Sequence, residues 1–595
     1  MQIEDLDGRP PMDGATIFAL TQRISLVHTR SATSFDWSMA DDYTLWSAVV
    51  AGDSTVVVGY KPATLDSINH ILHLIDLNNP DWMYARDYTI EFVRQQLQIL
   101  HPGTAFPTDT FLLRSHEVLP ILYFKLSDYE VIAGLRQLGT VVYVEPEGYN
   151  ENLYAADPIR TSGCNEETDQ IESSDYFTIS PNSKVSWHLG IGTHRVSLAW
   201  DVCPKGTGIT LGLIDTGIDS DNTYLSQSGL FTSGQSGGRT IEKFGTFDGT
   251  SPHDLCGHGT RMAGILAHPR TNNGGITGIA YKSSLVSYRV ANGVILDGTE
   301  EKEAVVDALT ALGDRSDVRI ISMSVGKVFE HQPITQAIKY AYGKGKLIFC
   351  AAGGGYQETH PAKSPSLANE VVAVTAAKYD YNDPNHVNLT KALYCPFDTY
   401  VDFAGLVEEN MPTKTRFALS TQLDNGASLA WSKKASAATA TTAGIAALVW
   451  SCNLNRSRAQ VLAILQQAGS RWGNVSTDYG YGVIDAKEAV DLANIPLPLT
   501  VQISEPSVIE ISGTYLWTAT VANSTAPNLT YTWKWNGTTV ATGTNVSSYT
   551  RSVIIPSSGT VTSTLSLTII EQGGLNRTQT ASQPLLIGDP AGEME

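Results

Sequence analysis

The middle of the chain alternates apolar runs with helical patterns. The mostly apolar run 209–214 predicts a strand buried in a parallel sheet, and it ends at an Asp-Thr-Gly turn. Residues 303–312 predict a helix, because apolar side chains recur there at helical spacing. Small residues dominate 258–267 and 436–449, which predicts two closely packed helices. Strands that alternate with helices favour an α/β fold.

A second set of patterns lies between residues 51 and 150. Apolar runs and amphipathic stretches predict, in order, strand 54–61, helix 65–75, helix 87–100, strand 119–126, helix 128–138 and strand 141–145. This order is typical of a small α+β ferredoxin-like module. Residues 1–50 form an amino-terminal extension, in which Trp37 and Trp46 can bury a small face. Residues 151–185 are mostly polar and predict a linker open to processing.

The chain changes character after a Pro-containing linker near residue 496. Residues 500–590 are rich in Thr, Ser, Val and Asn, with apolar and polar residues alternating at 501–503, 531–535 and 565–569. Asn536-Gly537 and 557–559 are turn signals between the predicted strands. These features predict an immunoglobulin-like β-sandwich without a disulfide, since the region lacks cysteine. Its role stays open between surface binding and stabilisation.

Composition and charge narrow the classes of partner. The 595 residues are too many for one core, which predicts several domains. A net charge of −20 argues against nucleic acid or an anionic membrane surface as a partner. No apolar run approaches the roughly 18 residues of a membrane span. The first residues show no basic and apolar signal-peptide pattern, which at face value indicates a cytoplasmic protein.

Three motifs carry the residue types of nucleophilic catalysis. Asp215 follows the predicted strand, His258 lies within Gly-His-Gly-Thr, and Ser436 opens a small-residue helix. A serine hydroxyl needs a neighbouring imidazole to take its proton, and the imidazole needs a carboxylate to fix its tautomer. The amino end of a helix offers unpaired N–H groups and a favourable dipole to an oxyanion. These residues are therefore predicted to form a catalytic triad.

The chain order Asp, His, Ser in these settings resembles the subtilase family of serine proteases. The resemblance covers residues 186–495 and implies a subtilisin-like α/β domain with a mostly parallel sheet. It also implies a serine endopeptidase that cleaves peptides or proteins and needs no cofactor for its chemistry. Residues 51–150 would then be a propeptide that inhibits the peptidase intramolecularly and is removed by self-processing between about 150 and 186. The alternative is that residues 51–150 are a permanent accessory domain. Subtilases of this kind are typically exported, so the resemblance and the missing signal peptide point to different compartments.

The resemblance also assigns contacts with substrate and ions. One segment is expected to pair with the substrate backbone: Ser324, Val325 and Gly326. A second is expected to form one wall of the specificity pocket: Ala351, Ala352 and Gly353. Asn272 opens a loop similar to the one that holds a structural calcium ion in many subtilases, and neutral oxygens suit calcium. A plain Asn-Gly turn explains the same loop equally well.

Two departures from the family pattern concern the oxyanion. Gly354 stands where the family has an asparagine that points its amide at the oxyanion, and Lys434-Ala435 replace Gly-Thr before the nucleophile. The oxyanion region is thus reduced to Gly354 and the Ser436 backbone N–H. In subtilisin, loss of one such donor lowers turnover by about 10²–10³. A slow protease is expected, and the alternative is a pseudoprotease that uses its cleft to bind peptides or its own propeptide.

Cysteine positions add little to the functional prediction. Six cysteines lie at 164, 203, 256, 350, 395 and 452, with no pair at metal-ligand spacing. Cys350 is expected in the core, and Cys256 is expected to line the cleft near His258. Two disulfides are compatible with the sequence, which does not decide between pairing and free thiols: Cys203–Cys256 and Cys395–Cys452.

Overall fold

The computed structural model separates the chain into two compact units, Met1–Ala493 and Asn494–Glu595. The structure describes residues 5, 7–28, 35–154, 164, 171–227, 238–247, 249, 251–327, 329–353, 369–380, 389–392, 395, 400–423, 428–497, 499–524, 526, 528–556, 560–572, 575 and 577–588.

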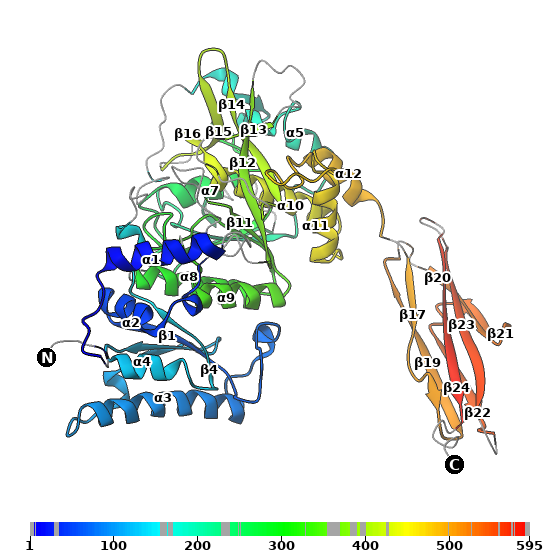
Figure 1. The fold of residues 1–595 in the computed structure, drawn as a ribbon. Helices are drawn as coiled ribbons and strands as arrows, with labels where there is room; N and C mark the ends of the chain where they lie inside the picture. Colours follow the sequence, from blue (N-terminus) through cyan, green and yellow to red (C-terminus); the bar gives the residue numbers. More distant parts are fainter. Residues whose placement is uncertain are drawn as a thin grey trace. The chain divides into compact units, whose positions relative to one another are not determined.

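A ten-stranded mixed sheet forms the centre of the first unit (Figure 1). Its main path runs β16-β15-β14-β12-β11-β10-β7-β9-β8, with β13 beside β12. The pairs from β14 to β8 are parallel, whereas β13, β15 and β16 pair antiparallel. The strands are β7 Thr210–Asp215, β8 Ile241–Gly245, β9 Ser284–Arg289, β10 Val318–Met323, β11 Leu347–Ala351, β12 Val371–Asp380, β13 Leu389–Lys391, β14 Phe403–Asn410, β15 Thr415–Thr421 and β16 Leu429–Ser432.

Helices cover both faces of this sheet. One face packs against α7 (His258–Ala267) and α10 (Lys434–Cys452), whose small side chains share a core with Leu211 and Leu213 of β7. The other face packs against α8 (Thr299–Asp314) and α9 (Gln332–Gly343), together with Ile214. This alternation along β7 confirms the predicted buried strand and the α/β fold. Among the described residues of this unit, three more α-helices are α5 Val196–Ala199, α11 Arg458–Gln467 and α12 Ala486–Asn494.

Helix α10 passes a simple test of length and hydropathy for a membrane span. Its best window has a mean hydropathy of 1.3, and 89% of that window is buried inside the protein. Burial of this extent is what the core helix of a folded domain requires, so the apolar composition is explained by packing.

The amino-terminal region forms a four-stranded sheet of order β2-β3-β1-β4 in which all neighbours are antiparallel. The predicted strands 54–61, 119–126 and 141–145 correspond to β1 (Thr55–Tyr60), β3 (Ile121–Lys125) and β4 (Val141–Pro146). The predicted helices 87–100 and 128–138 correspond to α3 (Pro80–Leu100) and α4 (Tyr129–Leu135). Three elements were not predicted: α1 Gly14–His28, α2 Asp42–Ala51 and β2 Leu112–Ser115.

The predicted helix at 65–75 is wrong. The segment forms turns, with a single 3-10 turn at Leu72–Leu74. Ile68 and Leu72 are buried, and their spacing of four residues imitates one face of a helix. Asp66 and Ser67 before Ile68, and Asn69 after it, favour turns over helix, because their side chains compete for backbone hydrogen bonds.

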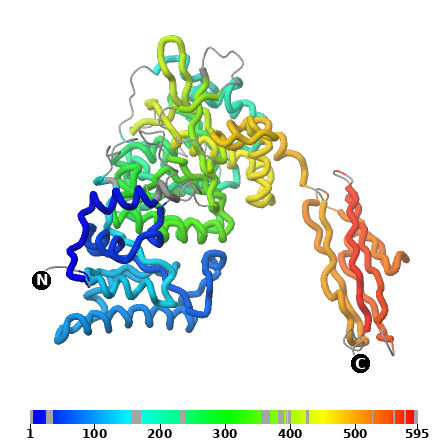
Figure 2. The backbone as a smooth tube through the Cα atoms, in the orientation of Figure 1, coloured from blue at the N-terminus to red at the C-terminus, as the bar shows by residue number. Residues whose placement is uncertain are grey.

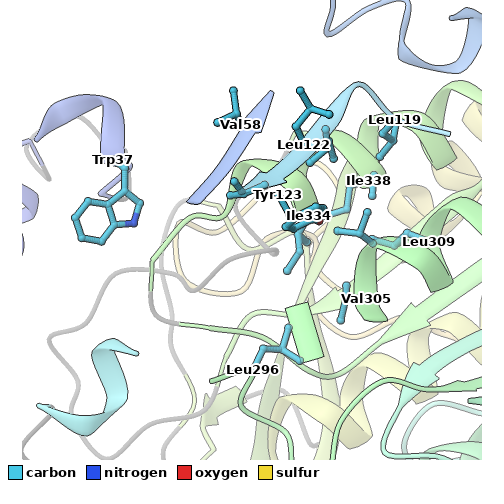
Figure 3. Packing of buried hydrophobic residues seen from close by; sticks show 14 of the residues in the cluster. Trp37, Val58, Leu119, Leu122, Tyr123, Leu296, Val305, Leu309, Ile334 and Ile338 are labelled. Atoms are coloured by element: carbon cyan, nitrogen blue, oxygen red, sulfur yellow. The ribbon is translucent and has the colours of Figure 1, made fainter. Parts of the chain in front are cut away.

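The amino-terminal sheet lies directly on α8 and α9, as both backbone views show (Figures 1 and 2). One continuous apolar cluster joins the two layers. Figure 3 shows Tyr123 of the sheet next to Ile334 of α9. The helices contribute Val305, Leu309, Ile334 and Ile338 to the cluster that also contains Val58 and Leu122. Burial of this shared apolar surface is the main force that holds the sheet in place.

The second unit is all β. Two sheets, β17-β19-β22 and β18-β24-β23-β20-β21, share one apolar core that contains Trp517 and Trp533. Asn536 and Gly537 both have positive φ between β20 and β21, as the predicted tight turn requires. The predicted turn at 557–559 lies outside the described residues. The strands are β17 Thr500–Ile503, β18 Val508–Ile509, β19 Gly513–Ala522, β20 Asn528–Trp535, β21 Thr538–Thr544, β22 Ser548–Val553, β23 Val561–Gln572 and β24 Thr578–Ile587.

Candidate active site

Asp215 and His258 meet at the carboxyl end of the parallel strands. Asp215 is the last residue of β7, and His258 is the first residue of α7. The His258 Nδ1 atom lies 2.6 Å from Asp215 Oδ1, with side-chain exposures of 4% and 0%. A buried carboxylate at this distance fixes the imidazole tautomer and orientation, leaving Nε2 to act as a base.

Glycines on both sides of His258 let α7 approach β7 this closely. Gly257 has a φ of 84°, which a side chain would strain. A Cβ atom on Gly259 would lie 2.2 Å from the Gly217 carbonyl oxygen. The Gly-His-Gly motif is therefore a packing requirement of the Asp215–His258 contact.

Asp254 is a positioning residue that the sequence analysis missed. Its carboxylate is 1% exposed and accepts five hydrogen bonds, all from residues that flank Asp215 or His258. The donors are Thr216 Oγ1, the N–H groups of Cys256, Gly257 and Thr260, and Thr260 Oγ1, at 2.7–3.0 Å. This network ties the turn after β7 to the first turn of α7 and so holds the carboxylate and the imidazole in register.

Ser436 lies in the first turn of α10, which packs against α7. Its side chain is half-buried, and among the hydrogen bonds between described residues none joins its hydroxyl to His258. Such catalytic hydrogen bonds are often long without substrate and tighten when it binds. Lys434, two residues earlier, has a φ of 62°, the left-handed conformation that favours glycine.

The expected substrate strand continues β10. Val325 is buried, and the Ser324 hydroxyl is buried without a hydrogen-bond partner in the described part of the chain. The Gly326 N–H donates to the Val294 carbonyl at 3.0 Å, and the Gly326 carbonyl accepts from the Leu296 N–H at 2.9 Å. A peptide can pair with Gly326 only after these two bonds open.

The expected pocket wall follows β11. Ala351 ends that strand, and the Ala352 N–H donates to the Val374 carbonyl of β12 at 2.9 Å. Gly353 has a φ of 112°, a conformation that glycine adopts without the strain a side chain would bring. Gly354, the expected oxyanion position, lies outside the described residues.

The loop at Asn272 does not fit a calcium site. The Asn272 carbonyl accepts from the Asn182 amide at 3.3 Å, and Asn273 Oδ1 accepts from Thr271 Oγ1 and the Gly275 N–H at 2.7 and 3.0 Å. The Lys184 ammonium lies 4.0 Å from the Cβ position of Gly274, where it would repel a cation. Over the described residues, no group of three or more His, Cys, Asp or Glu side chains could hold a metal ion.

The disulfide differs from both candidate pairs. Cys164 bonds to Cys256, with 4.5 Å between the Cα atoms, whereas Cys203, Cys350, Cys395 and Cys452 are free. Cys395 lies near the start of α10 and Cys452 ends it, so a helix of about 27 Å separates them. Cys203 is buried in the core. Cys256 therefore carries no free thiol beside His258, and it anchors the segment that leads from the amino-terminal sheet.

Asp402 holds the entry to β14 against β12. Its carboxylate accepts from the Ala373 N–H at 2.8 Å, and burial raises the pKa of Asp402 from 3.8 to about 6. Between pH 4 and 6 the folded chain keeps a proton that the unfolded chain releases, so stability falls as pH rises through this window.

Replacing Asp402 with asparagine should raise the free energy of unfolding at pH 7 by about 1 kcal/mol, with little change at pH 4. The asparagine still accepts from Ala373 but has no charge to desolvate. The gain is below the full pKa difference because Asp402 is only partly buried, so solvent screens its charge. Urea unfolding at several pH values in a Ser436→Ala background measures it, and the exposed Asp66→Asn serves as control. Equal effects of Asp402→Asn at pH 4 and 7 would contradict the electrostatic explanation.

The central part of the chain is similar to known proteins. A model of the subtilase family matches residues 206–482. Subtilisin DY of Bacillus licheniformis is 30% identical over 294 residues, 48% of this chain and 92% of that protein. Thermitase of Thermoactinomyces vulgaris is 28% identical over 296 residues, 49% of this chain and 91% of that protein.

A solved structure shares the fold over a longer stretch. The crystal structure of fervidolysin from Fervidobacterium pennivorans, a keratinolytic enzyme related to subtilisin, covers 90% of this chain and 91% of its own. The TM-score is 0.51 at 13% sequence identity, which indicates a shared fold alone. Because the family model matches around the Asp215–His258 contact and a relative at 30% identity is spanned over most of its length, this chain belongs to the subtilase family.

Proposed function

We propose that this protein is a serine endopeptidase, made as a proenzyme, in which Asp215, His258 and Ser436 form the catalytic triad. The observation that carries the proposal is the 2.6 Å hydrogen bond between buried Asp215 and His258. Ser436 supports it, because it lies in the first turn of the helix that packs against the helix of His258. Family membership supports a serine endopeptidase as the reaction class.

Each residue then has one task. The Ser436 hydroxyl attacks the scissile carbonyl while His258 Nε2 takes its proton and later gives it to the leaving amine. Asp215 holds Nδ1 and stabilises the imidazolium that forms. The Ser436 N–H and the amino end of α10 stabilise the oxyanion. A water then hydrolyses the acyl-enzyme by the same proton transfers.

The proenzyme part rests on the amino-terminal sheet. Its strand order and antiparallel pairing support a ferredoxin-like propeptide over residues 51–150. Arg114 pairs with Glu303 and Asp307 of α8 at 2.8 and 2.5 Å, and the Tyr143 hydroxyl donates to Gln336 of α9 at 3.3 Å. These contacts support an intramolecular inhibitor that docks on the peptidase domain of 186–495.

Because of the disulfide, the position of the processing cut determines whether the amino-terminal fragment stays covalently attached. We expect one cut between residues 151 and 185. A cut before Cys164 leaves the amino-terminal fragment bound by non-covalent contacts alone. A cut after Cys164 leaves that fragment attached to Cys256 until a thiol reductant breaks the bond. The disulfide also supports an oxidising compartment, and hence export.

Intact mass tests the proposal. The purified wild type should lose an amino-terminal fragment ending between residues 151 and 185, and Ser436→Ala should stay whole. Ser451→Ala, a change in the same helix, should process like the wild type. Masses with and without reductant place the cut before or after Cys164. If the wild type and Ser436→Ala both stay whole and neither cleaves a peptide in trans, the proposal fails.

A pseudoprotease is the second candidate, and the bonding of Gly326 favours it. The Gly326 N–H donates to Val294 and its carbonyl accepts from Leu296, so both groups are already paired and not available to a peptide strand. A serine-reactive fluorophosphonate probe distinguishes the two functions. Labelling that requires both Ser436 and His258 indicates a working nucleophile, and absence of labelling in the wild type indicates a binding protein.

A further inference from the structure

The amino-terminal region and the peptidase domain meet through buried charges of opposite sign. Glu145, Glu147 and Glu151 belong to β4 and the segment after it, and all three are buried. Lys302 of α8 and Lys327, directly after the expected substrate strand, face them from the peptidase domain. Buried charges need partners, because moving an unpaired charge out of water is strongly unfavourable.

Glu151 occupies a small site next to the expected substrate strand. Its carboxylate lies 3.4 Å from the Lys327 ammonium and accepts from the Phe329 N–H at 3.3 Å. The Glu151 and Lys327 side chains are 3% and 5% exposed. An ammonium and a backbone N–H that converge on one buried carboxylate are the donors of an anion-binding site.

The position of this site connects it with the substrate. Lys327 directly follows Gly326, the residue expected to pair with the peptide backbone. Glu151 is three residues before the end of the described segment 35–154, which leads into the expected processing region. A substrate strand that pairs with Gly326 would bring a side chain close to Lys327, where the Glu151 carboxylate now lies.

We propose that Lys327 and the Phe329 N–H form a specificity subsite for an acidic side chain, so that the protease prefers peptides with glutamate or aspartate on the amino-terminal side of the scissile bond. This inference rests on the proposed function. When processing removes the amino-terminal region, Glu145, Glu147 and Glu151 leave with it, and Lys302 and Lys327 lose their counter-ions. A substrate carboxylate restores one of these pairs, whereas a neutral side chain does not.

A charge swap tests the subsite. The self-processed full-length chain is assayed with peptides that carry Glu, Gln or Lys at successive positions before the scissile bond. The wild type should prefer Glu over Gln by about 10-fold in kcat/KM at one position. The double variant Glu151→Lys/Lys327→Glu keeps a pair of opposite charges at the domain contact and should prefer Lys over Gln at that same position. Lys339→Glu, a charge reversal on α9, is the matched control and should keep the wild-type preference.

The outcomes separate the subsite from the proposed function. If the neutral peptide is cleaved but Glu and Gln peptides react equally in every variant, the subsite is wrong and the protease stands. If no peptide is cleaved, the proposed function is wrong, and binding then tests the subsite. In Glu151→Ala, which lacks the carboxylate that fills the site, fluorescence anisotropy should show that the Glu peptide binds about 10-fold more tightly than the Gln peptide. Equal affinities there overturn the subsite as well.

Discussion

Ser436→Ala, His258→Ala and the double variant are expected to lower turnover by the same factor, about 10⁶. This is the behaviour of subtilisin, in which loss of the nucleophile or of the base costs nearly as much as loss of the whole triad. The physical reason is that a hydroxyl without a base, or a base without a hydroxyl, cannot transfer the proton. The remaining rate comes from binding and from the oxyanion donors, which both single variants keep.

Asp215→Asn should cost less, about 10⁴ in turnover. The amide keeps the shape of the carboxylate but can donate to His258 Nδ1, which favours the wrong tautomer. The same hydroxyl and imidazole remain, so a part of the catalytic rate survives.

Single-turnover kinetics with a chromogenic peptide measures these losses. Ser451→Ala, in the same helix as Ser436, should keep the wild-type rate. If the losses of Ser436→Ala and His258→Ala multiply in the double variant, the two residues act independently and do not form a triad.

The sequence predicts those parts of the fold that depend on local patterns. The apolar run before Asp215 leads to a buried strand, and β1, β3 and β4 follow from short apolar runs. Asp215 and His258 could be predicted as partners because their motifs place Asp215 at the carboxyl end of a parallel strand and His258 at the start of a helix, where such sheets form their sites. Their distance came only with the structure.

Other features depend on contacts between distant segments. Cys164 and Cys256 are 92 residues apart, and the sequence offered no reason to prefer this pair over Cys203–Cys256. The bonds of Gly326 to Val294 and Leu296 join two loops that are adjacent only in the folded domain. Asp254 could have been found in part from the sequence, since an aspartate often accepts from the N–H groups two and three residues on, here those of Cys256 and Gly257.

Glu147→Gln is expected to weaken the docking of the amino-terminal region by about 3–5 kcal/mol, the largest effect on stability among these predictions. Glu147 accepts from His331 Nε2 at 2.7 Å, and its Oε1 atom lies 3.7 Å from the Lys302 ammonium. The Glu147 and Lys302 side chains are 0% and 2% exposed. The glutamine leaves Lys302 buried beside a neutral partner, which is the costly way to break such a pair.

The shifted pKa of Glu147 predicts how the docking of the amino-terminal region depends on pH. Burial alone would raise the pKa of Glu147, but His331 and Lys302 lower it from 4.5 to about 2. The carboxylate therefore stabilises docking fully above pH 4.5, and this contribution is lost as pH falls towards 2. Glu147→Gln should remove that part of the acid sensitivity, whereas the exposed Glu117→Gln should leave it unchanged.

Removing both partners separates charge from packing. Hydrogen exchange of the β1 and β4 amides in a Ser436→Ala background measures docking without self-digestion. A buried pair replaced by apolar groups is often neutral, so Glu147→Gln/Lys302→Met should regain most of the protection that Glu147→Gln loses. If the double variant is as weak as the single one, the loss comes from packing at residue 147. Recovery instead means that the peptidase domain carries a buried cation that only an acidic partner can neutralise. Under that condition, Lys302 and Lys327 would attract an acidic substrate once the amino-terminal region has left.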